Sequence, residues 1–159
     1  FAKHVQKSNV FILIILLFFY KSQIKKSLLK IFILLSCVGV THLFTEYTKY
    51  LVQRDRPNVT EGLMGLLKIL YEPSNYSFFS GHASTSFAAS VFVYLTLASK
   101  FKYLGLIFIW PVFFSMSRIF VGVHFPSDVI VGAFVGTILG ILGHQLYVFS
   151  EEKLLRVGN

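Results

Sequence analysis

Three short polar clusters contain the side chains of this chain that could carry out chemistry. Long apolar stretches separate them, and together they supply three permanent cations, two imidazoles and one carboxylate. The clusters are Lys49 with Arg56-Pro57, then Ser80-Gly81-His82, and then Ser117-Arg118 with His124 and Asp128. Charged groups beside segments apolar enough to cross a bilayer are costly, so they are interpreted as functional. This combination predicts the binding and transfer of a phosphate group.

The first two clusters are suited to holding phosphate. Lys49 and Arg56 are seven residues apart, about two helical turns, so both point to one side if the helix continues. Ser80 and Gly81 precede an apolar helix, whose free N–H groups and positive dipole end favour an anion. These four residues are therefore predicted to bind phosphate.

The third cluster adds a nucleophile. His124 and Asp128 are four residues apart, and Pro126 and Ser127 between them are helix start signals. At this spacing a carboxylate can reach one ring nitrogen of the imidazole, fix its tautomer and stabilise positive charge on it. His124 is therefore the candidate nucleophile. His82, on another helix, is the candidate proton donor to the leaving group.

The composition predicts an integral membrane protein. Hydrophobic residues make up 55% of the 159 residues, charged residues only 14%, and the mean hydropathy is +0.68. The net charge is +8, but the basic residues separate apolar runs or belong to the clusters, so nucleic-acid binding is not favoured. The single cysteine, Cys37, lies in an apolar run and is interpreted as a buried, inert thiol.

Five apolar segments predict membrane helices in one all-α domain, residues 1–159, without internal repeats or linkers. They are residues 10–20 with an N-terminal extension, 31–45 continuing past Lys49, 83–99, 103–117 with a kink at Pro111, and 129–150. Residues 62–71 are too short to cross and predict an interfacial helix before the second cluster. Alternation of the helices would bring all three clusters to one membrane face.

Other residues within the apolar segments are assigned to packing. Gly132, Gly136 and Gly140 recur every four residues, which puts them on one helix face and predicts close approach to a neighbouring helix. His42 and His144 lie within apolar helices and belong to no cluster, so they are interpreted as interhelical polar contacts.

The combination Lys-x6-Arg-Pro, Ser-Gly-His and Ser-Arg-x5-His-x3-Asp resembles the signature of the type 2 phosphatidic acid phosphatase family. This family also includes vanadium haloperoxidases, but those relatives are soluble, so haloperoxidase chemistry is disfavoured. The resemblance runs from Lys49 to Asp128, half of the chain. The family usually has proline before Ser-Gly-His, where this chain has Phe79.

The resemblance implies a helical bundle, commonly with six membrane helices, so five to six are expected here. It also implies a phosphatase without metal or other cofactor that works through a phosphohistidine. In that scheme His124 attacks, Asp128 orients it and His82 protonates the leaving group. The phosphoryl oxygens would be bound by Lys49, Arg56 and Arg118, with hydrogen bonds from Ser80 and Gly81 and support from Ser117.

Two alternatives use the same residues. His82, His124 and Asp128 are ligand types for zinc, but the neighbouring cations would repel a divalent ion and no close-spaced histidine pair is present. A transporter or channel could use the charges as an ion pathway. Its charges would run through the middle of the helices, often in repeated halves, whereas these gather at helix ends.

The expected substrate is a phosphorylated membrane lipid whose tails stay in the bilayer. A site at the membrane surface beside the apolar residues 62–71 favours such a molecule. The 1-phosphate of lipid A and undecaprenyl diphosphate are preferred, with phosphatidic acid and phosphatidylglycerophosphate as alternatives. The sequence does not indicate an oligomeric state.

The distribution of basic residues predicts the orientation in the membrane. The connections at residues 21–30 and 100–102, with the C-terminal tail, contain eight Lys and Arg residues. The opposite side contains seven, of which three belong to the clusters, leaving four. The positive-inside rule then makes the first side cytoplasmic. The clusters would face the periplasm from a bacterial inner membrane.

Single cysteines in a Cys37-free background test this orientation. A cysteine replacing Gly65 should react with an impermeant thiol reagent in intact cells, whereas one replacing Gln23 should react only after permeabilisation. The reverse labelling pattern would place the clusters in the cytoplasm and point to glycerolipid phosphates of the inner leaflet.

Overall fold

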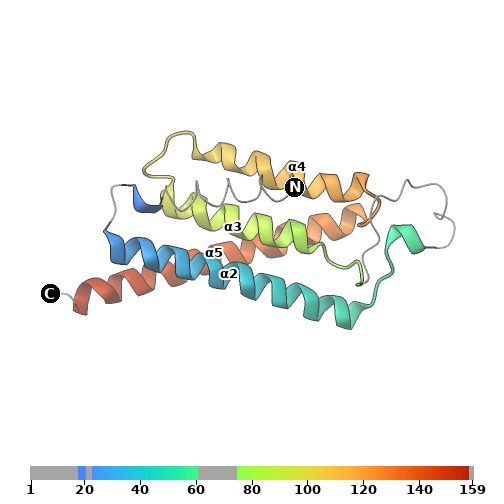
Figure 1. The fold of residues 1–159 in the computed structure, drawn as a ribbon, viewed down its shortest axis with the longest axis horizontal. Coiled ribbons are helices and arrows are strands. Elements are labelled where there is room, and N and C mark those ends of the chain that lie inside the picture. Colours follow the sequence, from blue (N-terminus) through green and yellow to red (C-terminus); the bar gives the residue numbers. More distant parts are fainter. Residues whose placement is uncertain (1–17, 21–22, 61–74, 158–159) are drawn as a thin grey trace, which may run out of the picture.

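The computed structural model describes residues 18–20, 23–60 and 75–157, and every regular element in these ranges is a helix (Figure 1). This confirms the all-α prediction for the described residues. The elements are α2 (Ile24–Val52), the short 3-10 helix η1 (Pro57–Val59), α3 (Gly81–Leu97), the 3-10 helix η2 (Leu104–Phe108), α4 (Ile109–Phe120) and α5 (Pro126–Val157).

Three predicted helices correspond to α2, α3 and α5, but the prediction for residues 103–117 was wrong in detail. This segment divides into η2 and α4, so Pro111 lies in the first turn of α4 rather than at a kink within one helix. Backbone N–H groups have no helical partner in a first turn, so proline costs no hydrogen bond there. The predicted helix at 62–71, and that at 10–20 before residue 18, lie outside the described residues.

The described bundle exposes apolar side chains and buries small polar ones. The phenylalanines Phe113, Phe120 and Phe134 are between 66% and 81% exposed, whereas Thr41 and Thr45 are fully buried. Each threonine hydroxyl donates to the carbonyl oxygen four residues earlier in α2, so its polarity is satisfied locally. This distribution is typical of a bundle surrounded by lipid. Two described segments, Ile24–Val59 and Pro126–Leu154, are long and apolar enough to cross a membrane; the count of five to six helices stays a prediction.

Helix α3 is central, packing against α2, α4 and α5 (Figure 1). It starts at the N-cap Ser80, whose hydroxyl accepts from the N–H of Ala83 at 3.4 Å. The Thr45 and Ser84 hydroxyls join α2 to α3 at 3.0 Å. Thr96 Oγ1 lies 3.2 Å from Nδ1 of His144 and joins α3 to α5. His144 thus makes an interhelical contact of the expected kind, whereas His42 is exposed on α2.

The glycines of α5 face the backbone of α3, which confirms their assignment to packing. A Cβ atom would come within 2.6 Å of the Ser80 carbonyl oxygen at Gly132, and within 2.1 Å of the Ser84 carbonyl oxygen at Gly136. At Gly140 it would lie 2.7 Å from the carbonyl oxygen of Ala88. No side chain fits in these spaces, so the two helices touch along their backbones.

Replacing Gly136 with alanine should therefore destabilise the protein. The new methyl group would force α3 and α5 apart, and overpacking of this kind costs about 1–3 kcal/mol of unfolding free energy. We expect a lower melting temperature in detergent. Gly39→Ala is the matched control, because it is also a helical glycine but has no neighbouring atom within 4 Å. Equal melting temperatures for the two variants would show that the α3–α5 contact is not this tight.

Candidate active site

The three clusters lie at the same end of the bundle, where α2 and α4 end and α3 and α5 begin (Figure 1). Lys49 is in the last turn of α2, and Arg56 lies in the segment that follows. The remaining cluster residues are Ser80, Gly81 and His82 at the start of α3, Ser117 and Arg118 at the end of α4, and His124 and Asp128 around the start of α5.

The Asp128 carboxylate is completely buried and is held by several donors. Its Oδ1 atom accepts from Nη1 of Arg54 at 2.7 Å. Its Oδ2 atom accepts from the Ser77 hydroxyl and from the N–H of Phe125 at 3.0 Å. The last contact is half of a capping box, in which an acid in the first helical turn bonds back to the N–H before the helix. These partners offset the large cost of removing a carboxylate from water.

His124 is buried beside Asp128. Its Nδ1 atom lies 3.6 Å from Oδ2 of Asp128, an ion-pair distance, and 3.4 Å from the Ser77 hydroxyl. Its Nε2 atom lies 3.4 Å from Nη1 of Arg56. A guanidinium can only donate hydrogen bonds, so this contact favours the tautomer with the lone pair on Nε2 and the proton on Nδ1. The ring thus presents a basic nitrogen on the side of Arg56.

The pKa of His124 is lowered from its ordinary value of 6.5, chiefly by burial. The neighbouring Asp128 raises this pKa, whereas the positive charge of Arg56 lowers it further. His124 therefore stays uncharged at a pH where an exposed histidine would already be partly protonated.

The Arg56 guanidinium is buried and fixed in place by backbone and side-chain oxygens. Its Nε and Nη2 atoms donate to the carbonyl oxygen and to Oδ1 of Asn75, each at 2.7 Å. Nη2 also donates to the carbonyl oxygen of Tyr76 at 3.1 Å, and Nη1 to that of Val123 at 2.7 Å. Arg56 thus ties the segment before α3 to the loop before His124.

Lys49 is buried next to the start of α3. Its Nζ atom lies 3.0 Å from Oε1 of Glu46, and it would be 4.0 Å from a Cβ atom placed on Gly81. The other Glu46 oxygen accepts from Nδ2 of Asn75 at 3.1 Å. Because Asn75 also binds Arg56, Glu46 and Asn75 link the two cations and offset the repulsion between them.

His82 and Arg118 belong to a second group, around Phe114. The His82 ring, exposed at the start of α3, lies 5.3 Å from the Phe114 ring, and the Arg118 guanidinium lies 5.4 Å from it. Nε and Nη2 of Arg118 donate to the Ser117 hydroxyl at 3.1 and 3.0 Å. This group adjoins the residues around His124, because the N–H of Val123 donates to the carbonyl oxygen of Arg118 at 3.2 Å.

Phe79 occupies the position before Ser-Gly-His and anchors this segment by burial. It is 2% exposed, and its ring lies 6.1 Å from that of Phe44 on α2. A contact between aromatic rings therefore holds the entry to α3 against α2.

Four residues that contact the predicted site residues were not predicted from the sequence: Glu46, Arg54, Asn75 and Ser77. Glu46 carried a usable signal, because it lies three residues before Lys49 on the same helix. Arg54 and Ser77 reach Asp128 across 74 and 51 residues, so no local pattern identifies them.

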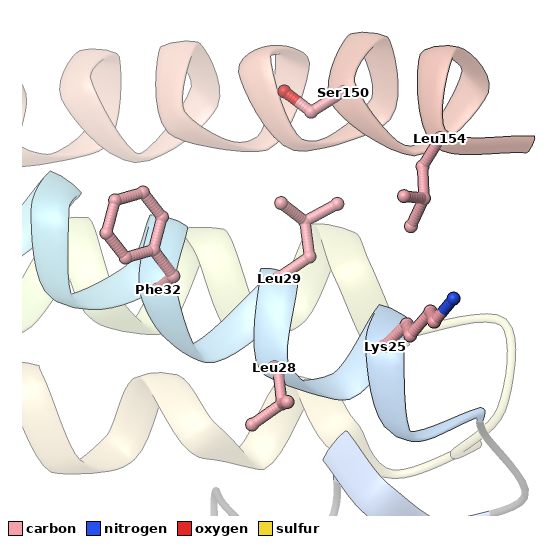
Figure 2. A pocket seen from close by; sticks show the side chains of 6 residues that line it. All are labelled: Lys25, Leu28, Leu29, Phe32, Ser150 and Leu154. Carbon is pink, nitrogen blue, oxygen red and sulfur yellow. The ribbon is translucent and has the colours of Figure 1, made fainter. Parts of the chain in front are cut away.

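The described residues hold no candidate metal centre at this site, and an apolar groove lies elsewhere. Within the described ranges, no three His, Cys, Asp or Glu side chains converge in a way that could hold a metal ion. The groove lies between the start of α2 and the later part of α5 (Figure 2), at the opposite end of the bundle from the clusters (Figure 1). It is lined by Lys25, Leu28, Leu29, Phe32, Ser150 and Leu154. The clusters instead form a positively charged site that contains the imidazoles of His124 and His82.

Relatives of this chain are named as phosphatases of lipid-linked substrates. A lipid A 4′-phosphatase of Porphyromonas gingivalis is 29% identical over 140 residues, which cover 86% of this chain and 59% of the relative. An undecaprenyl-diphosphatase of Sulfolobus acidocaldarius is 36% identical over 101 residues, which cover 64% of this chain and 47% of the relative. The chain thus spans about half the length of these curated relatives.

Solved structures share the fold. The crystal structure of Aquifex aeolicus LpxE aligns with a TM-score of 0.66 and 28% identity, covering 86% of this chain and 76% of that one. A transmembrane PAP2-type phosphatidylglycerolphosphate phosphatase from Bacillus subtilis aligns with the same TM-score at 24% identity, covering 91% of this chain and 70% of that one. At 24% identity, the similarity to the Bacillus subtilis structure shows a shared fold and nothing further.

The family model of the PAP2 superfamily matches residues 30–152, which include all three clusters. This confirms the resemblance seen in the spacing of the cluster residues. The chain belongs to the PAP2 superfamily.

Proposed function

We propose that this protein is an integral membrane phosphatase, with one catalytic domain, that hydrolyses the phosphate or diphosphate group of an envelope lipid. The observation that carries the proposal is the placement of His124, whose Nε2 atom lies 3.4 Å from a buried guanidinium while Nδ1 lies 3.6 Å from a buried carboxylate. This places a neutral nucleophile where an anionic phosphoryl group would be attracted. Membership of the PAP2 superfamily and the names of the relatives support it.

The proposed reaction has two displacement steps. In the first, Nε2 of His124 forms a bond to phosphorus while the bond from phosphorus to the leaving oxygen breaks. Asp128 stabilises the positive charge that develops on the ring, and His82 donates a proton to the leaving oxygen. In the second, water attacks the phosphohistidine, the phosphorus–nitrogen bond breaks and inorganic phosphate leaves.

Fixed cations would stabilise the charge on the phosphoryl oxygens in both steps. Lys49 and Arg56 are already held in place by Glu46 and Asn75, so they need little reorganisation. Arg118 would approach from α4, supported by Ser117. The Ser80 hydroxyl and the Gly81 N–H, at the start of α3, would add hydrogen bonds. With this charge available, the reaction needs no metal or other cofactor.

The lowered pKa of His124 suits this role. Only the neutral ring is a nucleophile, and a lower pKa keeps it neutral as the pH falls toward 6.5 and below. Activity should therefore extend further into the acid range than an ordinary histidine would allow.

Lipid A phosphate and undecaprenyl diphosphate are the preferred substrates. Two relatives are named lipid A 4′-phosphatase, so the 4′-phosphate joins the 1-phosphate as a candidate position. The undecaprenyl-diphosphatase and a decaprenylphosphoryl-5-phosphoribose phosphatase support a polyprenyl alternative. Phosphatidic acid and phosphatidylglycerophosphate remain further alternatives. We place the enzyme in the bacterial inner membrane with its site on the periplasmic face.

Phosphate release from a panel of these lipids, measured in EDTA, tests the function. The purified protein should hydrolyse at least one of them, and His124→Ala should reduce turnover by roughly a thousandfold or more while the melting temperature stays unchanged. A phosphoenzyme trapped by rapid quenching should be acid-labile and absent from this variant. The matched control is His42→Ala, an exposed histidine on α2. Full activity in His124→Ala, or activity that EDTA removes and zinc restores, would contradict the mechanism.

The role of His82 is tested by the leaving group. His82→Ala should slow the release of a lipid alkoxide far more than that of a nitrophenolate, because only the alkoxide needs a proton to leave. The measurement is the ratio of the two turnover rates in the wild type and in the variant. Equal losses on both substrates would indicate that His82 only positions the phosphate.

A further inference from the structure

Arg54 lies outside the three clusters but makes the closest ionic contact with the buried Asp128 carboxylate. Its Nη1 atom lies 2.7 Å from Oδ1 of Asp128 and 2.9 Å from the hydroxyl of Ser127. Its guanidinium carbon stands 4.1 Å from the centre of the Phe125 ring. Its backbone carbonyl accepts from the N–H of Ser77 at 2.8 Å. Arg54 thus joins the end of α2 to the start of α5 and to the segment before α3.

The two oxygens of Asp128 have different partners. Oδ1 is bound by Arg54, whereas Oδ2 is bound by Ser77 and Phe125 and faces Nδ1 of His124. With Oδ1 engaged, the buried carboxylate cannot turn about its terminal torsion without breaking its charged hydrogen bond to the partly exposed Arg54. Arg54 therefore keeps Oδ2 directed at the imidazole.

The contacts of Arg54 separate it from the cations that would bind phosphate. Arg56 lies on the Nε2 side of His124, and Lys49 lies beside the start of α3. Arg54 instead contacts the Asp128 oxygen that does not face His124. The charged contact of Arg54 therefore connects it to His124 through Asp128.

We propose that Arg54 is a positioning residue that orients the Asp128 carboxylate and so maintains the Nδ1-protonated, nucleophilic tautomer of His124. The kinetic part of this proposal rests on the proposed phosphatase function. The tautomer is a property of the resting protein and can be measured without turnover.

Steady-state kinetics on the best lipid substrate give the first test. Arg54→Gln should lower kcat by roughly 10- to 100-fold, the usual cost of losing a group that supports a catalytic side chain, with little change in KM. Arg54→Lys should recover part of the loss because it restores the charge but not the planar guanidinium. Lys153→Gln, which removes one exposed charge from the far part of α5, is the matched control and should leave kcat unchanged.

A double-mutant cycle shows whether Arg54 acts through Asp128. In an Asp128→Asn background the carboxylate charge is already absent, so adding Arg54→Gln should cost much less than it does in the wild type. Full additivity of the two losses, or a rise in KM for Arg54→Gln that matches its whole loss in kcat/KM, would mean that Arg54 binds substrate itself. Either result would overturn the proposal.

Nitrogen NMR of 15N-histidine-labelled protein supplies the test that needs no activity. The His124 signals, assigned by their absence in His124→Ala, should report the Nδ1–H tautomer in the wild type and a smaller share of it in Arg54→Gln. If Arg54→Gln does not fold, Arg54→Lys takes its place, with a smaller expected decrease because it keeps the charge but not the planar guanidinium. An unchanged tautomer would overturn the proposal even if the enzyme is active. Absence of phosphate release by the wild type would count only against the proposed function.

Discussion

The burial of one negative charge, on Asp128, organises this end of the molecule. A carboxylate without water must have donors around it, and here they come from different parts of the chain: Arg54 after α2, Ser77 before α3 and the N–H of Phe125 before α5. Satisfying this charge therefore brings three connecting segments together. The same carboxylate faces the imidazole that would attack phosphate, so the requirements of stability and of catalysis meet at one group.

Helix packing supplies the distances that the charged groups need. Because Gly132 and Gly136 have no side chains, α5 lies against the backbone of α3, and the N–H of Ser80 reaches the carbonyl oxygen of Asp128 at 3.0 Å. This contact joins the start of α3 to the start of α5, the helix that carries the carboxylate. A wider separation would move the proposed phosphate-binding residues away from the proposed nucleophile, so the glycine spacing helps to build the candidate site.

Much of the architecture and of the candidate site could be predicted from local patterns. The apolar runs identified α2, α3 and α5, and the four-residue glycine period identified the packing face of α5. The clusters identified the residues that gather where helices begin and end, because alternating helices bring those ends to one face. The spacing of His124 and Asp128 indicated their pairing, since one helical turn brings side chains four residues apart together. All of these are properties of short stretches of chain or of their order.

The tertiary structure alone decided which other residues complete the site. Arg54 and Ser77 reach Asp128 across 74 and 51 residues, and Asn75 reaches Glu46 across 29, so their pairing depends on how the helices pack and not on a repeat or a motif. Packing also decided where α4 begins, with Pro111 in its first turn after a 3-10 segment. The sequence by itself determined the membrane class, the family and the chemical groups; the structure decided their partners, because a buried charge is satisfied by whichever donors the fold brings within hydrogen-bonding distance.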